Sequence, residues 1–180
     1  MIEVKCVGRG GQGAVTFAQL LSVGAFYEGY YVQAMPMFGV ERRGAPSMSF
    51  TRISKKPILI RSQIYEPDYV VVLDSGLLCV KGMLSGLKQK GVVLANARKE
   101  QSISVKGVKS CFIDATSIAL KEFGKDIVNT AMLGAFAAYT KLVSLKNLYK
   151  AVDERFRNED MRKKNKRMIK LTYEKCLEKI

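Results

Sequence analysis

Over the first two thirds of the chain, short apolar stretches alternate with longer stretches of helical spacing. Residues 2–7 alternate apolar and polar side chains, which is typical of a half-buried strand, and residues 14–27 contain neither proline nor charge and predict a helix. Further strands are expected over residues 30–34, 47–53, 58–60, 69–73, 92–95 and 111–113, and residues 76–90 have helical spacing. Strands that alternate with helices predict an α/β fold with a largely parallel sheet.

The last third of the chain is helical in its pattern, with helices expected over residues 115–123, 127–141, 145–156 and 158–178. A turn signal at Lys55, Lys56 and Pro57 precedes the predicted strand 58–60, so that residues 47–60 suggest an antiparallel edge. No internal repeat or low-complexity linker divides the chain. We therefore expect one domain over residues 1–180, a three-layer α/β/α arrangement with a mostly parallel, mixed sheet and a helical C-terminal region over about 115–180.

Composition excludes several classes of protein and of active site. The 180 residues are 48% hydrophobic and 26% charged, with 15 Gly and 4 Pro, which excludes a fibrous or largely disordered chain. The absence of histidine removes the commonest general base, the triads that depend on it and any histidine-bearing metal site. The cysteines form no closely spaced pair for zinc or an iron–sulfur cluster and lie in apolar stretches, so we expect buried free thiols and no metal. They are Cys6, Cys79, Cys111 and Cys176.

Nothing in the sequence predicts export or membrane insertion. The chain opens Met-Ile-Glu-Val-Lys, which lacks the apolar core of a signal peptide. The longest charge-free stretches, residues 10–27 and 127–140, fall short of the roughly 20 apolar residues that a transmembrane helix needs. We expect a cytoplasmic protein without a membrane partner.

The net charge of +14 suggests an anionic partner, and nucleic acid is the first to consider. The excess is weighted toward the C-terminus, where residues 162–167 carry five positive charges. An apolar stripe runs through the same predicted helix and indicates that the helix docks on the protein, so its charges are better interpreted as a solvated face than as a nucleic-acid site. The stripe consists of Ile169, Tyr173, Cys176, Leu177 and Ile180.

A glycine-rich turn follows the first predicted strand. Gly8, Gly10 and Gly13 satisfy the pattern G-x-G-x-x-G between a strand and a helix, where backbone amides can hold a phosphate or carboxylate. A dinucleotide site also needs an acidic residue about 20 positions later, yet residues 33–35 are Gln-Ala-Met. Three interpretations stay open at this point: a dinucleotide site, an anion contact and a purely structural turn.

Two segments are unusually poor in charge. Residues 10–40 contain one charged residue, Glu28, where the composition would place about eight, and residues 127–140 contain none. Either central helices are buried on both sides by their own fold, or the segments form an obligate subunit interface with a charge-depleted core. The second interpretation is favoured because two helices and a connecting segment share the deficit.

Immediately after the first of these segments, Glu41, Arg42 and Arg43 stand beside Gly44 and Pro46. Adjacent arginines can form a fork that binds a carboxylate or phosphate. The alternative, favoured on spacing alone, is a surface ion pair worth less than about 1 kcal/mol.

Taken together, these motifs resemble one protein family. The chain is similar from residue 2 to about 178 to the gamma subunit of 2-oxoacid:ferredoxin oxidoreductases, with the pyruvate synthase and 2-oxoisovalerate branches nearest. The likeness rests on motifs that occur in the same order over the full length. They are Gly-Arg-Gly-Gly-Gln-Gly at 8–13, Gln-Ala at 33–34, Phe-Gly-Val-Glu-Arg-Arg-Gly-Ala-Pro at 38–46, Phe-Thr-Arg-Ile at 50–53, Asp-Ala-Thr at 114–116 and Asn-Thr-Ala-Met-Leu-Gly-Ala at 129–135.

The resemblance implies a cytoplasmic hetero-oligomeric oxidoreductase that converts a 2-oxoacid such as pyruvate and coenzyme A into acyl-CoA, carbon dioxide and reduced ferredoxin. It also implies that thiamine diphosphate, magnesium and iron–sulfur clusters belong to partner subunits of alpha, beta and delta type. This chain is then expected to hold no catalytic residue, metal or cofactor of its own and to be inactive alone. A stand-alone basic nucleotide-binding α/β module and a basic RNA-binding domain are the competing hypotheses.

Our hypothesis for the site is that the glycine turn and the arginine pair lie near a subunit junction and shape the approach of coenzyme A, whose phosphates favour positive potential. The competing hypothesis is that residues 41–46 only lock subunits together. The candidate residues are Gly8, Arg9, Gly10, Gly11, Gln12, Gly13, Glu41, Arg42, Arg43 and Gly44.

Overall fold

The fold is built on a mixed sheet, seen in the computed structural model, which describes residues 1–37, 44–103 and 105–180. Within these ranges the strand order is β2-β3-β1-β4-β5-β6; β3 is antiparallel to both β1 and β2, and the other neighbouring pairs are parallel. This confirms the prediction of a mostly parallel, mixed sheet. The strands are β1 (Ile2–Arg9), β2 (Tyr31–Pro36), β3 (Pro46–Ser54), β4 (Tyr69–Val72), β5 (Val92–Asn96) and β6 (Lys109–Ile113).

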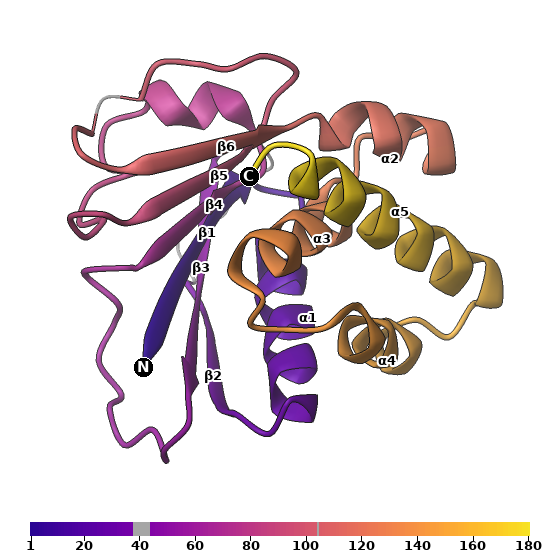
Figure 1. Cartoon of the computed structure of the whole chain (residues 1–180), viewed down its shortest axis with the longest axis horizontal. Coiled ribbons are helices and arrows are strands. Elements are labelled where there is room, and N and C mark those ends of the chain that lie inside the picture. The colour runs from indigo at the N-terminus through magenta and orange to yellow at the C-terminus, as the bar shows by residue number, and fades with distance from the viewer. Residues whose placement is uncertain (38–43, 104) are drawn as a thin grey trace.

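The α-helices gather on one face of the sheet, whereas the opposite face carries a thinner layer (Figure 1). That thinner layer consists of the short 3₁₀ helix η1 (Ser75–Cys79) and loops that bury a second, smaller apolar cluster. The predicted α/β class is confirmed, although the third layer contains no α-helix among the described residues. The helices are α1 (Ala14–Tyr27), α2 (Ala115–Phe123), α3 (Asn129–Thr140), α4 (Leu145–Arg155) and α5 (Glu159–Leu177).

Two predicted elements are wrong. Of the helix expected over residues 76–90, only η1 forms, because Gly82 and Gly86 adopt positive φ angles and a Cβ at Gly86 would collide with the carbonyl oxygen of Tyr65. Residues 58–60 form no strand, and Leu59 is 87% exposed. The antiparallel edge exists, but β3 pairs with β2 instead.

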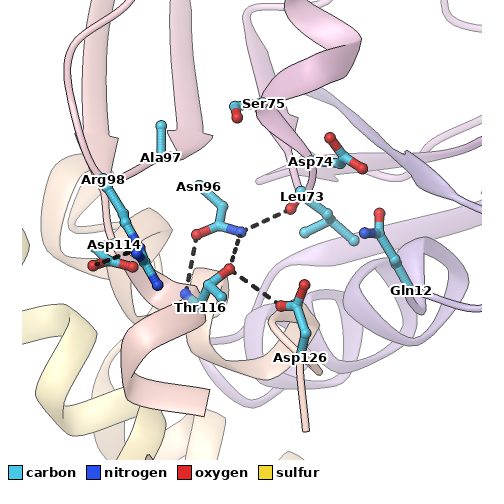
Figure 2. Close-up of a pocket in the computed structure, with 10 residues that line it drawn as sticks. All are labelled: Gln12, Leu73, Asp74, Ser75, Asn96, Ala97, Arg98, Asp114, Thr116 and Asp126. Carbon is cyan, nitrogen blue, oxygen red and sulfur yellow. Dashed lines mark hydrogen bonds and ion pairs between the residues drawn. The ribbon is translucent and has the colours of Figure 1, made fainter. Parts of the chain in front are cut away.

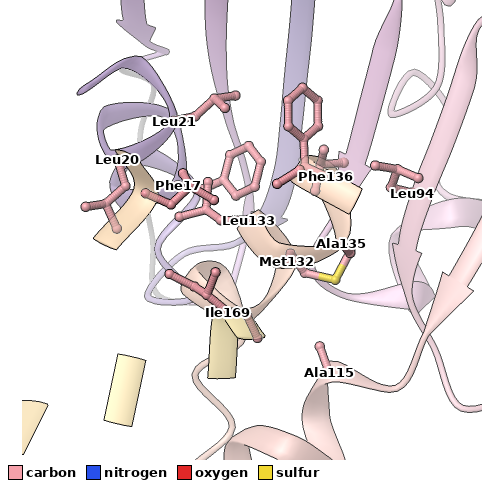
Figure 3. Packing of buried hydrophobic residues seen from close by; sticks show 14 of the residues in the cluster. Phe17, Leu20, Leu21, Leu94, Ala115, Met132, Leu133, Ala135, Phe136 and Ile169 are labelled. Carbon is pink, nitrogen blue, oxygen red and sulfur yellow. The ribbon is translucent and has the colours of Figure 1, made fainter. Parts of the chain in front are cut away.

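The charge deficit of α1 and α3 has an internal cause. Every residue from Asn129 to Ala138 is buried, and α1 packs between the sheet and the helices α3 and α4. Figure 3 shows side chains of both helices in the main core, where the rings of Phe17 and Phe136 meet edge to face with centroids 6.3 Å apart. For α3 and for most of α1 the favoured interface interpretation is wrong, because their own chain covers these uncharged surfaces. The C-terminal end of α1, with Phe26 and Tyr27, stays exposed.

The C-terminal helix docks on the protein as predicted, but two positions of the predicted apolar stripe are wrong. Leu177 is 41% and Ile180 56% exposed, because α5 ends at Leu177. Ile169 and Cys176 are buried, and the opposite face carries ion pairs such as Lys163–Glu159 and Lys164–Asp160. The basic run is therefore a solvated face. Among the described residues, no helix combines the length and the apolar character that a membrane crossing requires.

Cysteine burial follows the prediction at three positions of four. Cys6, Cys111 and Cys176 are buried free thiols, whereas Cys79 is exposed because it ends the surface helix η1.

Candidate functional site

A polar pocket of about 320 Å³ lies where the parallel strands end (Figure 2). After β1 the chain adds β2 and β3 toward one edge of the sheet, and the later strands β4, β5 and β6 are added toward the other edge. The boundary between β1 and β4 is therefore a topological switch point. Crevices outside the carboxyl ends of strands at such points are the usual ligand sites of open α/β sheets. The pocket is lined by Gln12, Leu73, Asp74, Ser75, Asn96, Ala97, Arg98, Asp114, Thr116 and Asp126.

Asn96 fixes the floor of this pocket. Its Nδ2 donates to the carbonyl of Leu73 and to Oγ1 of Thr116, both at 2.9 Å, and its Oδ1 accepts the amides of Ala115 and Thr116. One buried amide thus ties the end of β4 to the first turn of α2. The hydroxyl of Thr116 donates in turn to Asp126.

Asp114 forms one wall as the N-cap of α2. Its Oδ1 accepts the Ser117 amide at 2.9 Å and its Oδ2 the Ser117 hydroxyl at 2.6 Å, while Arg98 lies 3.8 Å away. Partial burial raises the pKa of this carboxyl, but the hydrogen bonds from Ser117 and the charge of Arg98 act more strongly together and lower the pKa below its usual value. Asp114 is therefore a fixed negative charge in the pocket.

The opposite wall joins the pocket to the glycine turn. The Nε of Arg9 donates to Asp74 at 2.7 Å, and the amide of Arg9 donates to Oε1 of Gln12 at 2.7 Å. The second oxygen of Asp74 accepts the amide of Gly76. Arg9 is thereby held at the pocket rim, with its Nη1 also 3.4 Å from the carbonyl of Gly44.

The glycine turn itself is held by contacts that explain its composition. Gly13 has φ +83° at the start of α1, and a Cβ there would collide with the side-chain amide of Asn129. Gly10 donates its amide to Ala45 at 2.7 Å and accepts from Gly44 at 3.2 Å. The structure therefore brings the turn and Gly44 together, whereas Glu41, Arg42 and Arg43 lie outside the described residues.

The sheet order argues against a dinucleotide site at this turn. In a dinucleotide-binding fold the ribose-binding acid ends the strand next to β1, but here antiparallel β3 lies between β1 and β2. The residues at the end of β2 are therefore not neighbours of the turn.

Sequence reasoning missed most of the pocket. Asp74, Asn96 and Asp114 each come at or just after the end of an apolar strand, which was the available signal. The lining supplies carboxylates, hydroxyls and one arginine but no thiol, and no group of three or more candidate metal ligands occurs within the described ranges. This chemistry suits the binding of a polar partner group.

A second exposed feature is the surface that we call the β2 edge, defined as β2 with Phe26, Tyr27 and Met37. Residues 29–37 carry no charge, Phe26 is 63% exposed and Tyr31 is 50% exposed. A groove of about 470 Å³ follows this surface, lined by Phe26, Gly29, Tyr30, Tyr31 and Val32. Uncharged apolar edge strands are normally avoided because their free backbone groups invite pairing with another chain.

Comparison with known proteins gives concordant matches over nearly the whole chain. A family model described as "Pyruvate ferredoxin/flavodoxin oxidoreductase" matches residues 3–175. The chain is 53% identical to pyruvate synthase subunit PorC of Methanothermobacter marburgensis, covering 97% of both chains, and 50% identical to the common subunit gamma of pyruvate/ketoisovalerate oxidoreductases of Pyrococcus furiosus, again covering 97% of both. The crystal structure of pyruvate oxidoreductase subunit PORC from Thermotoga maritima superposes with a TM-score of 0.84 at 36% identity, covering 96% of this chain and 95% of that one.

Proposed function

This chain belongs to the pyruvate ferredoxin/flavodoxin oxidoreductase family, and on that premise we propose that it serves as the gamma subunit of a pyruvate, or related 2-oxoacid, ferredoxin oxidoreductase. Complexes of this family catalyse the oxidative decarboxylation of a 2-oxoacid with coenzyme A. The observation that carries the proposal is the near-complete coverage of gamma-type relatives from one end of the fold to the other.

We assign the redox and thiamine chemistry to partner subunits. Thiamine diphosphate, magnesium and iron–sulfur clusters would be held by subunits of alpha, beta and delta type, with ferredoxin as the electron acceptor. The gamma-type relatives that this chain matches over nearly its whole length support its assignment as a separate subunit. The isolated chain is then a positioning and assembly subunit.

Reconstitution tests this function. Co-expression with the partner subunits is expected to give one complex that reduces ferredoxin in the presence of a 2-oxoacid and coenzyme A, whereas this chain alone gives no turnover. Comparing pyruvate with branched-chain 2-oxoacids would identify the substrate. A chain that stays monomeric beside all partners would contradict the proposal.

Within the complex, we place coenzyme A near the glycine turn and residues 41–44. Gly44 and Ala45 are hydrogen-bonded to Gly10, and the guanidinium of Arg9 reaches the carbonyl of Gly44. The strand β2 runs toward this same end of the sheet, since it is antiparallel to β3 and β3 is antiparallel to β1. Residues 41–44 continue from this point and contain two arginines. Their positive charge would favour binding of the three phosphate groups of coenzyme A.

Kinetic measurements on the assembled complex distinguish a role in coenzyme A binding from a role that only locks the subunits together. The double variant Arg42→Ala, Arg43→Ala is expected to raise the apparent KM for coenzyme A at least several-fold while the subunits stay together, and exposed Arg61→Ala is the control that should leave KM unchanged. Dissociation of the complex would support the locking hypothesis instead. Unchanged coenzyme A kinetics in an intact complex would refute both.

A further inference from the structure

Two buried thiols from distant parts of the chain face each other beneath the C-terminal helix. The Sγ atoms of Cys111 in β6 and Cys176 in α5 lie 3.9 Å apart, and both residues are buried. The other cysteines are elsewhere: Cys6 lies in the middle of β1, and Cys79 is exposed at the end of η1. Only the first pair is therefore placed for a reaction between two thiols of the same chain.

The surroundings distinguish the two sulfur atoms. The Sγ of Cys176 also lies 3.4 Å from the carbonyl oxygen of Ala135, which fixes this side chain against α3. The hydrogen bond with Cys176 and the charge of Lys179 together outweigh the effect of burial and lower the pKa of Cys111. The same hydrogen bond and burial raise the pKa of Cys176. Lys179 is held beside the pair by donating to the carbonyl of Phe112 at 2.7 Å. Cys111 is thus the better nucleophile of the two, since the thiolate is the reactive form.

A small oxidant has a short route to the pair. The helix α5 ends at Leu177, one residue beyond Cys176, and residues 177–180 are exposed. Opening of this last turn would uncover both sulfur atoms without unfolding the sheet, because terminal turns open at much lower free energy than the core. Closing a disulfide needs the sulfur atoms to approach from 3.9 Å to about 2.05 Å, which lies within the movement of a terminal turn.

We propose that Cys111 and Cys176 are a redox modification site that a hydroperoxide converts into an intramolecular disulfide joining β6 to α5. In the first step the Cys111 thiolate attacks a peroxide oxygen, the O–O bond breaks and a sulfenic acid forms, with one water produced from hydrogen peroxide. In the second step the Cys176 sulfur attacks the sulfenic sulfur, the S–S bond forms and a second water leaves. Two thiols are oxidised and one peroxide is reduced to two waters.

The bond would change how the C-terminal helix is held. It would close a loop between two residues 65 positions apart, containing α2, α3, α4 and most of α5. A cross-link over a loop of this length restricts the unfolded chain strongly, so the oxidised form should unfold at a temperature higher by about 5–10 °C.

Mass spectrometry of the full chain tests the proposal. The protein is treated with a small excess of hydrogen peroxide, remaining thiols are blocked with N-ethylmaleimide, and the peptides are mapped without reduction. We expect a linked pair of peptides containing Cys111 and Cys176, lighter by two hydrogen atoms than the free thiols and separated by dithiothreitol, while Cys6 is blocked only after denaturation. The background variant Cys79→Ser removes the exposed competing thiol.

The single variants Cys111→Ser and Cys176→Ser should each abolish the linked peptide and the rise in unfolding temperature. If either serine variant fails to fold, the peptide map of the Cys79→Ser protein still decides the question. Recovery of both Cys111 and Cys176 as free thiols after peroxide has oxidised Cys79 in the wild-type chain would overturn the proposal, as would disulfides between separate chains alone.

Discussion

Arg52 binds three separate parts of the chain from an almost completely buried position. With 2% of its surface exposed, its Nε donates to Glu3 at 2.9 Å and its Nη1 to Gln33 at 3.1 Å. The remaining donors reach the carbonyls of Ile60 and Gln63. One guanidinium therefore joins β1, β2 and β3 and fixes the loop that the sequence suggested as a strand.

Replacing Arg52 with Met should destabilise the chain by about 3–5 kcal/mol, because the Glu3 carboxylate and the carbonyls of Ile60 and Gln63 would lose a buried partner. Urea unfolding followed by circular dichroism measures the change. Arg61→Met, at an exposed position, should remain within about 0.5 kcal/mol of the wild type. Equal stabilities of the two variants would contradict the role given to Arg52.

Gly13 and Gly11 offer a matched pair for the glycine turn. Both have positive φ angles, but a Cβ at Gly11 meets nothing within 4 Å, whereas one at Gly13 would collide with Asn129. Gly11→Ala should therefore cost only about 1 kcal/mol of stability and Gly13→Ala clearly more. In thermal unfolding, adding Asn129→Ala should recover part of the Gly13→Ala loss. No such recovery would argue against the steric explanation.

Among the elements, α2 shows how one cap supports both a helix and the pocket. Asp114 accepts the Ser117 amide and hydroxyl, and its pKa is lowered in the folded chain. A lowered folded pKa adds stability above the unfolded value, near pH 4, and this contribution is lost as the pH falls through the folded pKa.

Asp114→Ala should therefore destabilise the chain by about 1 kcal/mol at pH 7, while Asp114→Asn should retain most of the cap. Wild type should exceed Asp114→Asn in stability at pH 6, and this difference should shrink as the pH falls below about 4. Urea titrations at several pH values measure it. A difference that grows at low pH would contradict the assigned direction.

The elements also show where sequence patterns succeed. The helix over residues 115–123 is found with the predicted bounds because Asp114 is a local start signal and Gly124 a local stop signal, and both act without tertiary help. The predicted helix 76–90 fails because apolar spacing there reflects contact with the sheet, while Gly82 and Gly86 set the backbone. A periodic pattern reports burial and does not distinguish a helix from a buried loop.

For the whole molecule, the β2 edge is the surface that we expect partner subunits to cover. Its apolar side chains are exposed in the single chain, whereas α3 and most of α1, which are equally uncharged, are already covered. Burying such a surface would shield the free edge of β2 and supply the charge-poor core of a stable interface.

Tyr31→Lys is expected to weaken assembly, because a charge would be buried without a partner at this edge. The measurement is co-purification with the partner subunits, followed by size-exclusion chromatography. Val80→Lys is the control, since Val80 is a comparably exposed apolar residue beside η1, on the other face of the sheet. Loss of assembly with Val80→Lys but not with Tyr31→Lys would contradict this prediction, because it would place the subunit interface beside η1 instead of at the β2 edge.

The sequence alone determined the α/β class, nearly all the elements and the family, because local periodicity, caps and ordered motifs act over short distances along the chain. Tertiary structure decided what the charge deficit meant: α3 is uncharged because α5, α1 and the sheet cover it, whereas the β2 edge keeps its uncharged surface exposed. It also decided that Asp74, Asn96 and Asp114 share one pocket, since strand order brings together residues that lie far apart in sequence. Burial and proximity depend on packing between distant segments, which no local pattern specifies.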